Sequence, residues 1–146
     1  MTEIITIMKN ILLLAFSLFS FISYSQDNDT PQYSIDVELK ECIKLSEGID
    51  AEIIKCELNA AEAWDGELNK YYRQLMEVLN PEQQKALRES QRQWIIYKDM
   101  EGSFLSQFYG KQTGTMWRVI SAGRIKEIIK TRALELKEYY ELQQSF

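Results

Sequence analysis

The chain contains no histidine, and its 146 residues include only two cysteines and two prolines. Without histidine, the sequence lacks the most common general acid or base and the most common imidazole ligand for metals. Two thiolates cannot complete a structural zinc site, which takes four ligands. We therefore expect no metal, no cofactor and no enzyme activity. Hydrolysis by a pair of carboxylates is the one catalytic alternative that this composition leaves open.

Positive charge is also scarce, since 17 lysines and arginines stand against 22 aspartates and glutamates and give a net charge of -5. An acidic surface repels phosphate backbones, so nucleic acid is not an expected partner. It favours cationic partners instead, through an attraction that salt weakens. The sequence is 45% hydrophobic and 27% charged, which is typical of a folded domain.

The longest apolar run covers residues 11–22 and follows the basic Lys9. Small residues occupy the first and third positions before a possible cleavage point after Ser25, as in a secretory signal. We predict a signal peptide over residues 1–25 and an exported mature chain, periplasmic or secreted, that has no membrane span. The alternative is an N-terminal membrane anchor, but the run is short for a bilayer. Met8 is an alternative start to Met1.

Cys42 and Cys56 form an even pair, and export would place them in an oxidising compartment. A disulfide between them is therefore the expected state, with two buried free thiols as the alternative. Closing a loop of this size stabilises a fold by about 3 kcal/mol in the chain-entropy model.

Apolar residues recur at three- and four-residue steps along most of the mature chain, with no strand-like alternation. Asn80, Pro81 and Gln83 have the residue types of a helix N-cap, first turn and reciprocal cap, so one helix ends and the next begins there. Gly48 is expected to end a short helix, Asp50 to cap the next, and Thr113 or Thr115 to cap the last.

The predicted fold is all-α, an up-down bundle of three long helices led by a short, disulfide-tethered helix. Between residues 81 and 109, we expect Leu87, Trp94, Tyr97, Phe104 and Phe108 to form the buried face. Trp94 and Tyr97 fit a binding platform as well, but we favour a core role. The expected segments are a flexible leader over residues 26–35 and helices over 36–45, 51–79, 81–109 and 115–142, which place one helical domain at residues 36–146.

Several motifs between residues 40 and 137 resemble the N-terminal domain of the LprI-like lysozyme-inhibitor family. They are Cys42, Cys56-Glu57, Asp65, Leu68-Asn69, Tyr72, Leu87, Gln91-Arg92, Trp94, Tyr97, Lys98-Asp99, Arg132 and Leu136. The resemblance implies an exported helical protein whose partner is a protein, with lysozyme as the candidate. A second cysteine pair that many members carry is absent, since its positions fall near Gly102 and Arg124.

Five polar residues of the helices, namely Asp65, Asn69, Gln91, Glu101 and Arg132, fit either a site or a satisfied network between helices. We favour the network, because none of them pairs a nucleophile with a base. Arg132 is expected to pair with a carboxylate of one of the two preceding long helices.

The candidate for partner contacts is the loop that follows the second long helix, which contains Tyr109, Gly110, Lys111, Gln112 and Thr113. Lys111 has the charge to meet the catalytic carboxylates of a muramidase, although we favour a plain helix connection. A run of carboxylates (Glu47, Asp50, Glu52, Glu57 and Glu62) would steer a basic lysozyme or simply form a solvated face. The sequence thus favours an exported, non-enzymatic binding protein. The alternative is an envelope structural or interaction module with another partner.

Overall fold

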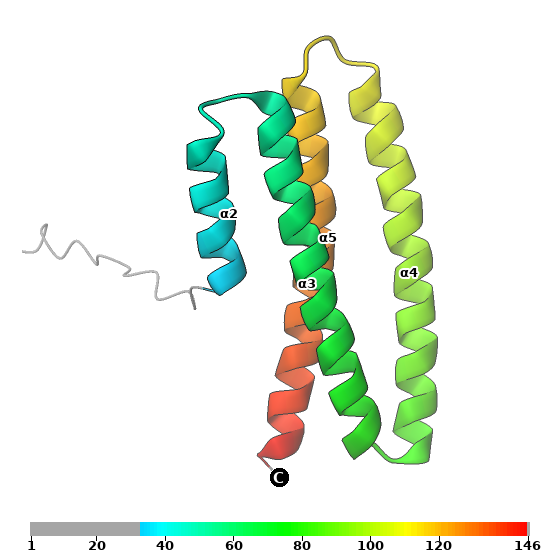
Figure 1. The fold of residues 1–146 in the computed structure, drawn as a ribbon. Coiled ribbons are helices and arrows are strands. Elements are labelled where there is room, and N and C mark those ends of the chain that lie inside the picture. Colours follow the sequence, from blue (N-terminus) through cyan, green and yellow to red (C-terminus); the bar gives the residue numbers. More distant parts are fainter. Residues whose placement is uncertain (1–32, 146) are drawn as a thin grey trace, which may run out of the picture. The chain divides into compact units, whose positions relative to one another are not determined.

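The computed structural model describes residues 33–145. The predicted signal peptide, its cut after Ser25 and the leader up to residue 32 lie outside the described residues. Four helices and no strand make up the described part, as the all-α prediction required (Figure 1). They are α2 (Ser34–Leu45), α3 (Asp50–Val78), α4 (Pro81–Gly110) and α5 (Met116–Gln144). The three long helices alternate in direction, running down, up and down in Figure 1, and the short α2 leads them.

The connection between α3 and α4 has the predicted capping box. The Asn80 side chain accepts a hydrogen bond from the Gln83 backbone N–H at 2.9 Å, and the Gln83 side chain accepts one from the Asn80 N–H at 3.1 Å. Gln84 adds side-chain bonds to the carbonyls of Leu79 and Met76, which closes the end of α3. These bonds satisfy groups that helix ends otherwise leave unpaired, so the turn is sharp and the two helices are antiparallel.

The turn between α2 and α3 corrects two expectations. Ile49 occupies the N-cap position and Asp50 is already helical, so Asp50 does not cap α3. The carboxylate of Asp50 instead accepts a hydrogen bond from the hydroxyl of Thr115, the N-cap residue of α5, which makes no cap bond of its own. The C-cap of α2 is Ser46 and not Gly48, although Gly48 has the left-handed φ of +82° that glycine tolerates.

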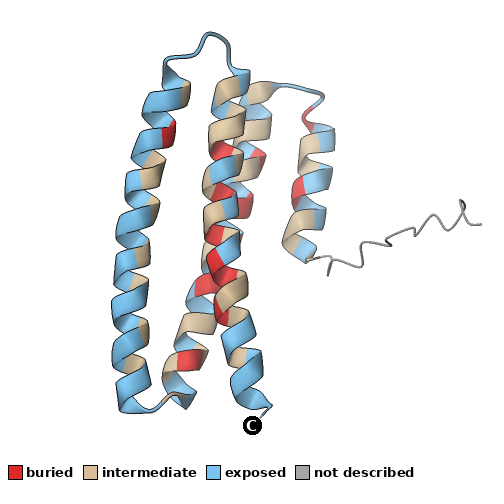
Figure 2. Cartoon of the chain, turned by 180° about the vertical axis from the view of Figure 1, so that it is seen from behind, coloured by how far each residue is buried: buried red, intermediate tan, exposed pale blue. Residues whose placement is uncertain are grey.

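The main core lies between α3 and α5. Trp64, Leu68 and Leu75 of α3 are at most 2% exposed and pack against Ala133 and Leu136 of α5. Small residues at such a contact let two helices approach closely along their whole length. Buried positions accordingly concentrate on these two helices, with few on α4 (Figure 2).

Helix α4 packs against α5 but hardly touches α3. Leu105 is its one buried residue, and the predicted buried face is therefore wrong for three aromatic residues. Tyr97, Phe104 and Phe108 are 51%, 55% and 51% exposed. The periodicity placed them on one side of the helix, but no neighbouring helix covers that side. Leu87 and Trp94 are half-buried and pack against the main core.

Two links hold α2 against the bundle. The predicted disulfide joins Cys42 of α2 to Cys56 of α3. An ion pair of 2.7 Å joins Asp36 to Lys130 of α5, and Leu39 packs beside Cys56 in a small second core. None of the helices within residues 33–145 has the length and apolar character that crossing a bilayer requires.

Reduction of the disulfide should destabilise the fold, because it releases a loop with a sequence separation of 14 residues. We expect the free energy of unfolding to fall by about 3 kcal/mol when dithiothreitol is added. Thermal unfolding with and without reductant measures this, and the variant Cys42→Ser/Cys56→Ser is the control that should not respond to reductant. Equal melting temperatures for the oxidised and reduced protein would show that the small second core holds α2 without the bond.

Candidate functional site

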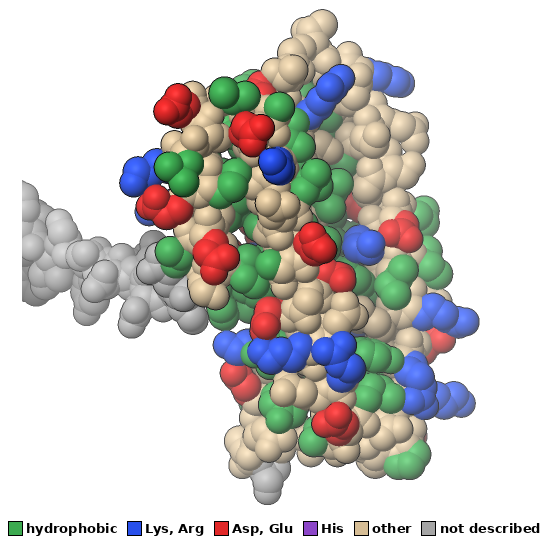
Figure 3. All heavy atoms as spheres, viewed as in Figure 1, with side chains coloured by type: hydrophobic (Ala, Val, Ile, Leu, Met, Phe, Trp, Pro, Cys, Tyr) green, Lys and Arg blue, Asp and Glu red, His purple; other side chains and the backbone are tan. Residues whose placement is uncertain are grey.

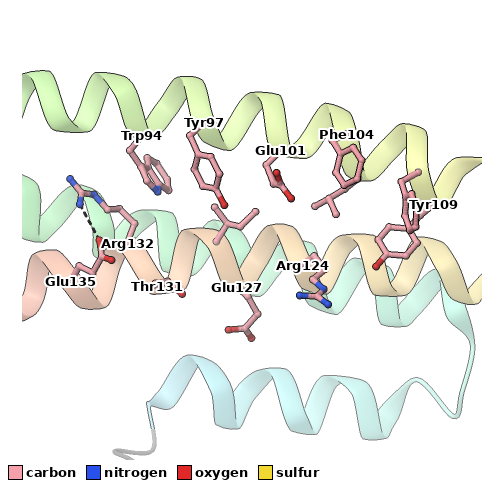
Figure 4. Close-up of a pocket in the computed structure, with 13 residues that line it drawn as sticks. Trp94, Tyr97, Glu101, Phe104, Tyr109, Arg124, Glu127, Thr131, Arg132 and Glu135 are labelled. Atoms are coloured by element: carbon pink, nitrogen blue, oxygen red, sulfur yellow. Dashed lines mark hydrogen bonds and ion pairs between the residues drawn. The ribbon is translucent and has the colours of Figure 1, made fainter.

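Arg132 of α5 is the junction between α5 and α4. Its side chain is buried, and its guanidinium donates to Gln91 at 3.1 Å, to Ser90 at 3.1 Å and to Glu135 at 3.0 Å. Ser90 and Gln91 belong to α4. Glu135 belongs to α5 itself, and Figure 4 shows its contact with Arg132. The carboxylate partner was therefore predicted on the wrong helix. Neutral side chains of α4 accept the other hydrogen bonds of the guanidinium, so both helices supply partners to the buried charge.

The other polar residues of the predicted network lie apart from this junction. Asn69 donates to the Asp65 carboxylate at 2.8 Å, and both residues belong to the outer surface of α3. Glu101 of α4 makes no hydrogen bond or ion pair with any residue between 33 and 145. The five residues thus form two separate pairs, Gln91 with Arg132 and Asn69 with Asp65, and Glu101 belongs to neither.

A second buried charge joins α3 to α5. Lys126 lies 3.2 Å from Glu57 and 3.0 Å from Glu127, and its side chain is 9% exposed. Burial alone would lower the pKa of Lys126, but hydrogen bonds and attraction from Glu127 and Glu57 outweigh it and raise that pKa. The lysine therefore stays charged at neutral pH. Glu57, one of the motif residues, holds helices together beside the disulfide.

Two further motif residues take different places in the fold. The ring of Tyr72 packs against the main core. Arg92 lies on the surface of α4, where it pairs with Glu89 at 2.7 Å. Ion pairs of this exposed kind contribute little to stability.

A groove of about 580 Å³ lies between α4 and α5 (Figure 4). Leu105 and Ile128 are among its lining residues. The α4 wall consists of Trp94, Tyr97, Glu101, Phe104, Phe108 and Tyr109, and the α5 wall consists of Arg124, Glu127, Thr131, Arg132 and Glu135. Trp94 and Tyr97 thus share one wall, and the half-exposed Tyr97 is not the core residue that we favoured.

The predicted partner loop is shorter than expected, because Tyr109 and Gly110 form the last turn of α4. Tyr109 stacks on Trp117 with ring centroids 5.8 Å apart, which anchors the two sides of the loop. Lys111, Gln112 and Thr113 are exposed. The loop is thus a short exposed segment between two fixed helix ends.

This loop and the α2–α3 turn lie at the same end of the bundle, here called the loop end and defined as residues 45–52 and 111–116. The hydrogen bond between Thr115 and Asp50 connects its two halves. Three apolar side chains are left in solvent there, namely Leu45 at 78%, Ile49 at 57% and Met116 at 58% exposed. Glu47 and Glu52 are exposed beside them, and acidic and hydrophobic groups alternate over this turn in Figure 3.

Sequence reasoning identified the carboxylates and the loop but missed these three apolar residues. Leu45 and Ile49 flank the break after α2, and Met116 is the first residue of α5. Helical periodicity is weakest at helix ends, so no stripe marked them. Among residues 33–145, no three aspartate, glutamate or cysteine side chains gather as ligands of a metal ion would.

Replacement of Arg132 by alanine should loosen α4 from α5. Gln91, Ser90 and Glu135 would lose their common partner, at a cost of about 2–3 kcal/mol in the free energy of unfolding. Urea denaturation measures the loss. Arg92→Ala is the matched control, because the ion pair of Arg92 with Glu89 is exposed and its removal should hardly change stability. Equal stabilities of the two variants would contradict a clamping role for Arg132.

Comparison with known proteins adds three findings. The family model described as lysozyme inhibitor LprI matches residues 42–136, which is more than half of the chain. A crystal structure of an uncharacterised protein from Burkholderia thailandensis is similar to this chain, with a TM-score of 0.73 and 25% sequence identity. The similarity covers 78% of this chain and 57% of that one, and no curated protein matches. The chain belongs to the LprI lysozyme-inhibitor family.

Proposed function

We propose that the mature protein is an exported binding protein without enzyme activity, which inhibits a basic muramidase of the lysozyme type through its loop end. The observation that carries the proposal is the uncovered set of Leu45, Ile49 and Met116 with carboxylates at its edge. An apolar centre with a charged rim is the usual composition of a protein-binding surface. Family membership supports lysozyme as the partner.

The loop end is fixed in place before any partner arrives. The Cys42–Cys56 disulfide holds α2 to α3, and the bond between Asp50 and Thr115 holds the start of α5 to the start of α3. Stacking of Tyr109 on Trp117 closes the remaining side. A surface that is already ordered loses less conformational entropy on binding, which favours affinity.

Charge supports a basic partner. The net charge of -5 also holds for residues 26–146, because residues 1–25 contain one glutamate and one lysine. Glu47 and Glu52 lie at the rim of the loop end, where charges chiefly raise the association rate and fix orientation. Screening by salt should therefore weaken the complex.

Lys111 is the residue that would block the active site of the lysozyme. It is the one charged residue of the exposed segment between α4 and α5. Retaining and inverting glycosidases both act through two carboxylates that flank the scissile bond. A lysine that enters this cleft from the loop would pair with these carboxylates and exclude the substrate.

Titration of the oxidised mature protein, residues 26–146, into a lysozyme lysis assay tests this function. We expect inhibition that weakens as salt rises. Glu47→Lys/Glu52→Lys should raise the inhibition constant about tenfold, because two favourable rim charges become repulsive. Glu77→Lys/Glu138→Lys is the control for net charge, since it also reverses two charges, at exposed residues of α3 and α5 far from the loop end.

Lys111→Ala should abolish the inhibition of lysozyme but weaken the binding of lysozyme much less. If several lysozyme types were left uninhibited at low salt, the proposal would fail. The protein would then act as an envelope module with a different partner.

A further inference from the structure

One flank of α4 carries an apolar stripe that no other described element covers. Tyr97, Met100, Phe104 and Phe108 follow one another at steps of three and four residues, so they share one side of the helix. They are 51%, 69%, 55% and 51% exposed, and the rings of Phe104 and Phe108 stack at 5.6 Å. Continuous apolar surface of this kind marks an interaction site in a soluble protein.

The groove beside this stripe contains one carboxylate and one guanidinium that have no partner within residues 33–145. Glu101 points from α4 toward α5, and Arg124 lies on the opposite wall (Figure 4). Neither forms an ion pair or a hydrogen bond with a described residue, whereas Arg132 and Glu135 in the same groove are paired. Glu101 is half-buried beside aromatic side chains, which favours a counter-charge, and Arg124 is exposed and accessible to a partner.

We propose that a second copy of this chain covers the stripe and the groove, in a twofold dimer in which Glu101 of each copy pairs with Arg124 of the other. A twofold interface is self-complementary, so a contact between two positions occurs twice. A purely cationic partner would satisfy Glu101 and repel Arg124, and an anionic partner would do the reverse. In a twofold dimer, a second copy places its Arg124 against Glu101 and its Glu101 against Arg124, so both charges meet an opposite charge.

The stripe and the groove are long enough for such an interface. From Trp94 to Tyr109 they extend along about 22 Å of helix. Aromatic residues are enriched at the centres of protein interfaces, and Tyr97, Phe104 and Phe108 would supply them in duplicate. Pairing α4 with α4 would also support the helix that is held least firmly in the monomer.

The dimer leaves the α2–α3 half of the proposed lysozyme site uncovered. Helix α4 and helix α2 lie on opposite sides of the α3–α5 pair in Figures 1 and 2. Contact through α4 therefore leaves the α2–α3 turn, with Leu45 and Ile49, free in both copies. The dimer would then present two α2–α3 turns, one from each chain.

The test is the oligomeric state of the mature protein, measured by sedimentation equilibrium. We expect a concentration-dependent dimer in the wild type. Glu101→Arg and Arg124→Glu should each raise the dissociation constant about a hundredfold, because symmetry creates two like-charge contacts. An equimolar mixture of these two variants should dimerise again, since each mixed dimer regains two opposite-charge pairs. The double variant Glu101→Arg/Arg124→Glu should dimerise as well.

Arg88→Glu is the matched control, because Arg88 is an exposed residue of α4 on a side away from the stripe. It should leave the dimer unchanged, and circular dichroism should show the same helix content for all variants. Phe104→Ser should weaken the dimer without any change of charge. A monomer at millimolar concentration would overturn the proposal, as would a dimer that neither reversal affects or a mixture that does not reassociate.

Discussion

The packing of α3 against α5 is the constraint on which the rest of the molecule depends. Trp64, Leu68 and Leu75 are almost fully buried there against Ala133 and Leu136, and few other contacts in the fold remove as much apolar surface from water. The remaining helices are attached to this pair by separate local devices. The disulfide attaches α2 to α3, and the buried guanidinium of Arg132 attaches α4 to α5. The buried pair of Glu57 and Lys126 adds a polar link inside the central interface itself.

This arrangement, a central helix pair with two attached helices, explains which apolar surfaces of the molecule stay exposed to solvent. Helices α3 and α5 bury each other's apolar faces. Helix α4 therefore packs along one edge of this pair, against α5, and keeps an apolar flank in solvent. The loop end is uncovered for a different reason, since both connections that meet there are short and their apolar residues lie at helix ends. The two surfaces differ in chemistry. The α4 flank is aromatic, and the groove beside it has one carboxylate and one guanidinium without a partner among the described residues, which suits a second copy. The loop end is aliphatic with an acidic rim, which suits a basic protein.

Features set by neighbouring residues could be predicted from the sequence, and features set by distant packing could not. The capping box at Asn80 and Gln83, the four helices and the disulfide depend on short-range chemistry and were confirmed. Tyr97, Phe104 and Phe108 were wrongly expected in the core, because periodicity identifies a shared face but not whether another helix covers it. Asp50 was misassigned as a cap because its actual partner, Thr115, lies 65 residues away. Arg132 was correctly expected to bond across helices, but neutral Gln91 and Ser90 took the role expected of a carboxylate.

The central claim is that a basic lysozyme docks on the loop end. Hydrogen exchange of the oxidised mature protein, alone and with excess lysozyme, tests it most directly because it reports binding and location together. The account predicts slower exchange of backbone amides within residues 45–52 and 111–116, with the middle of α3 unchanged. Lysozyme-dependent protection confined to other segments, or none at low salt, would contradict it.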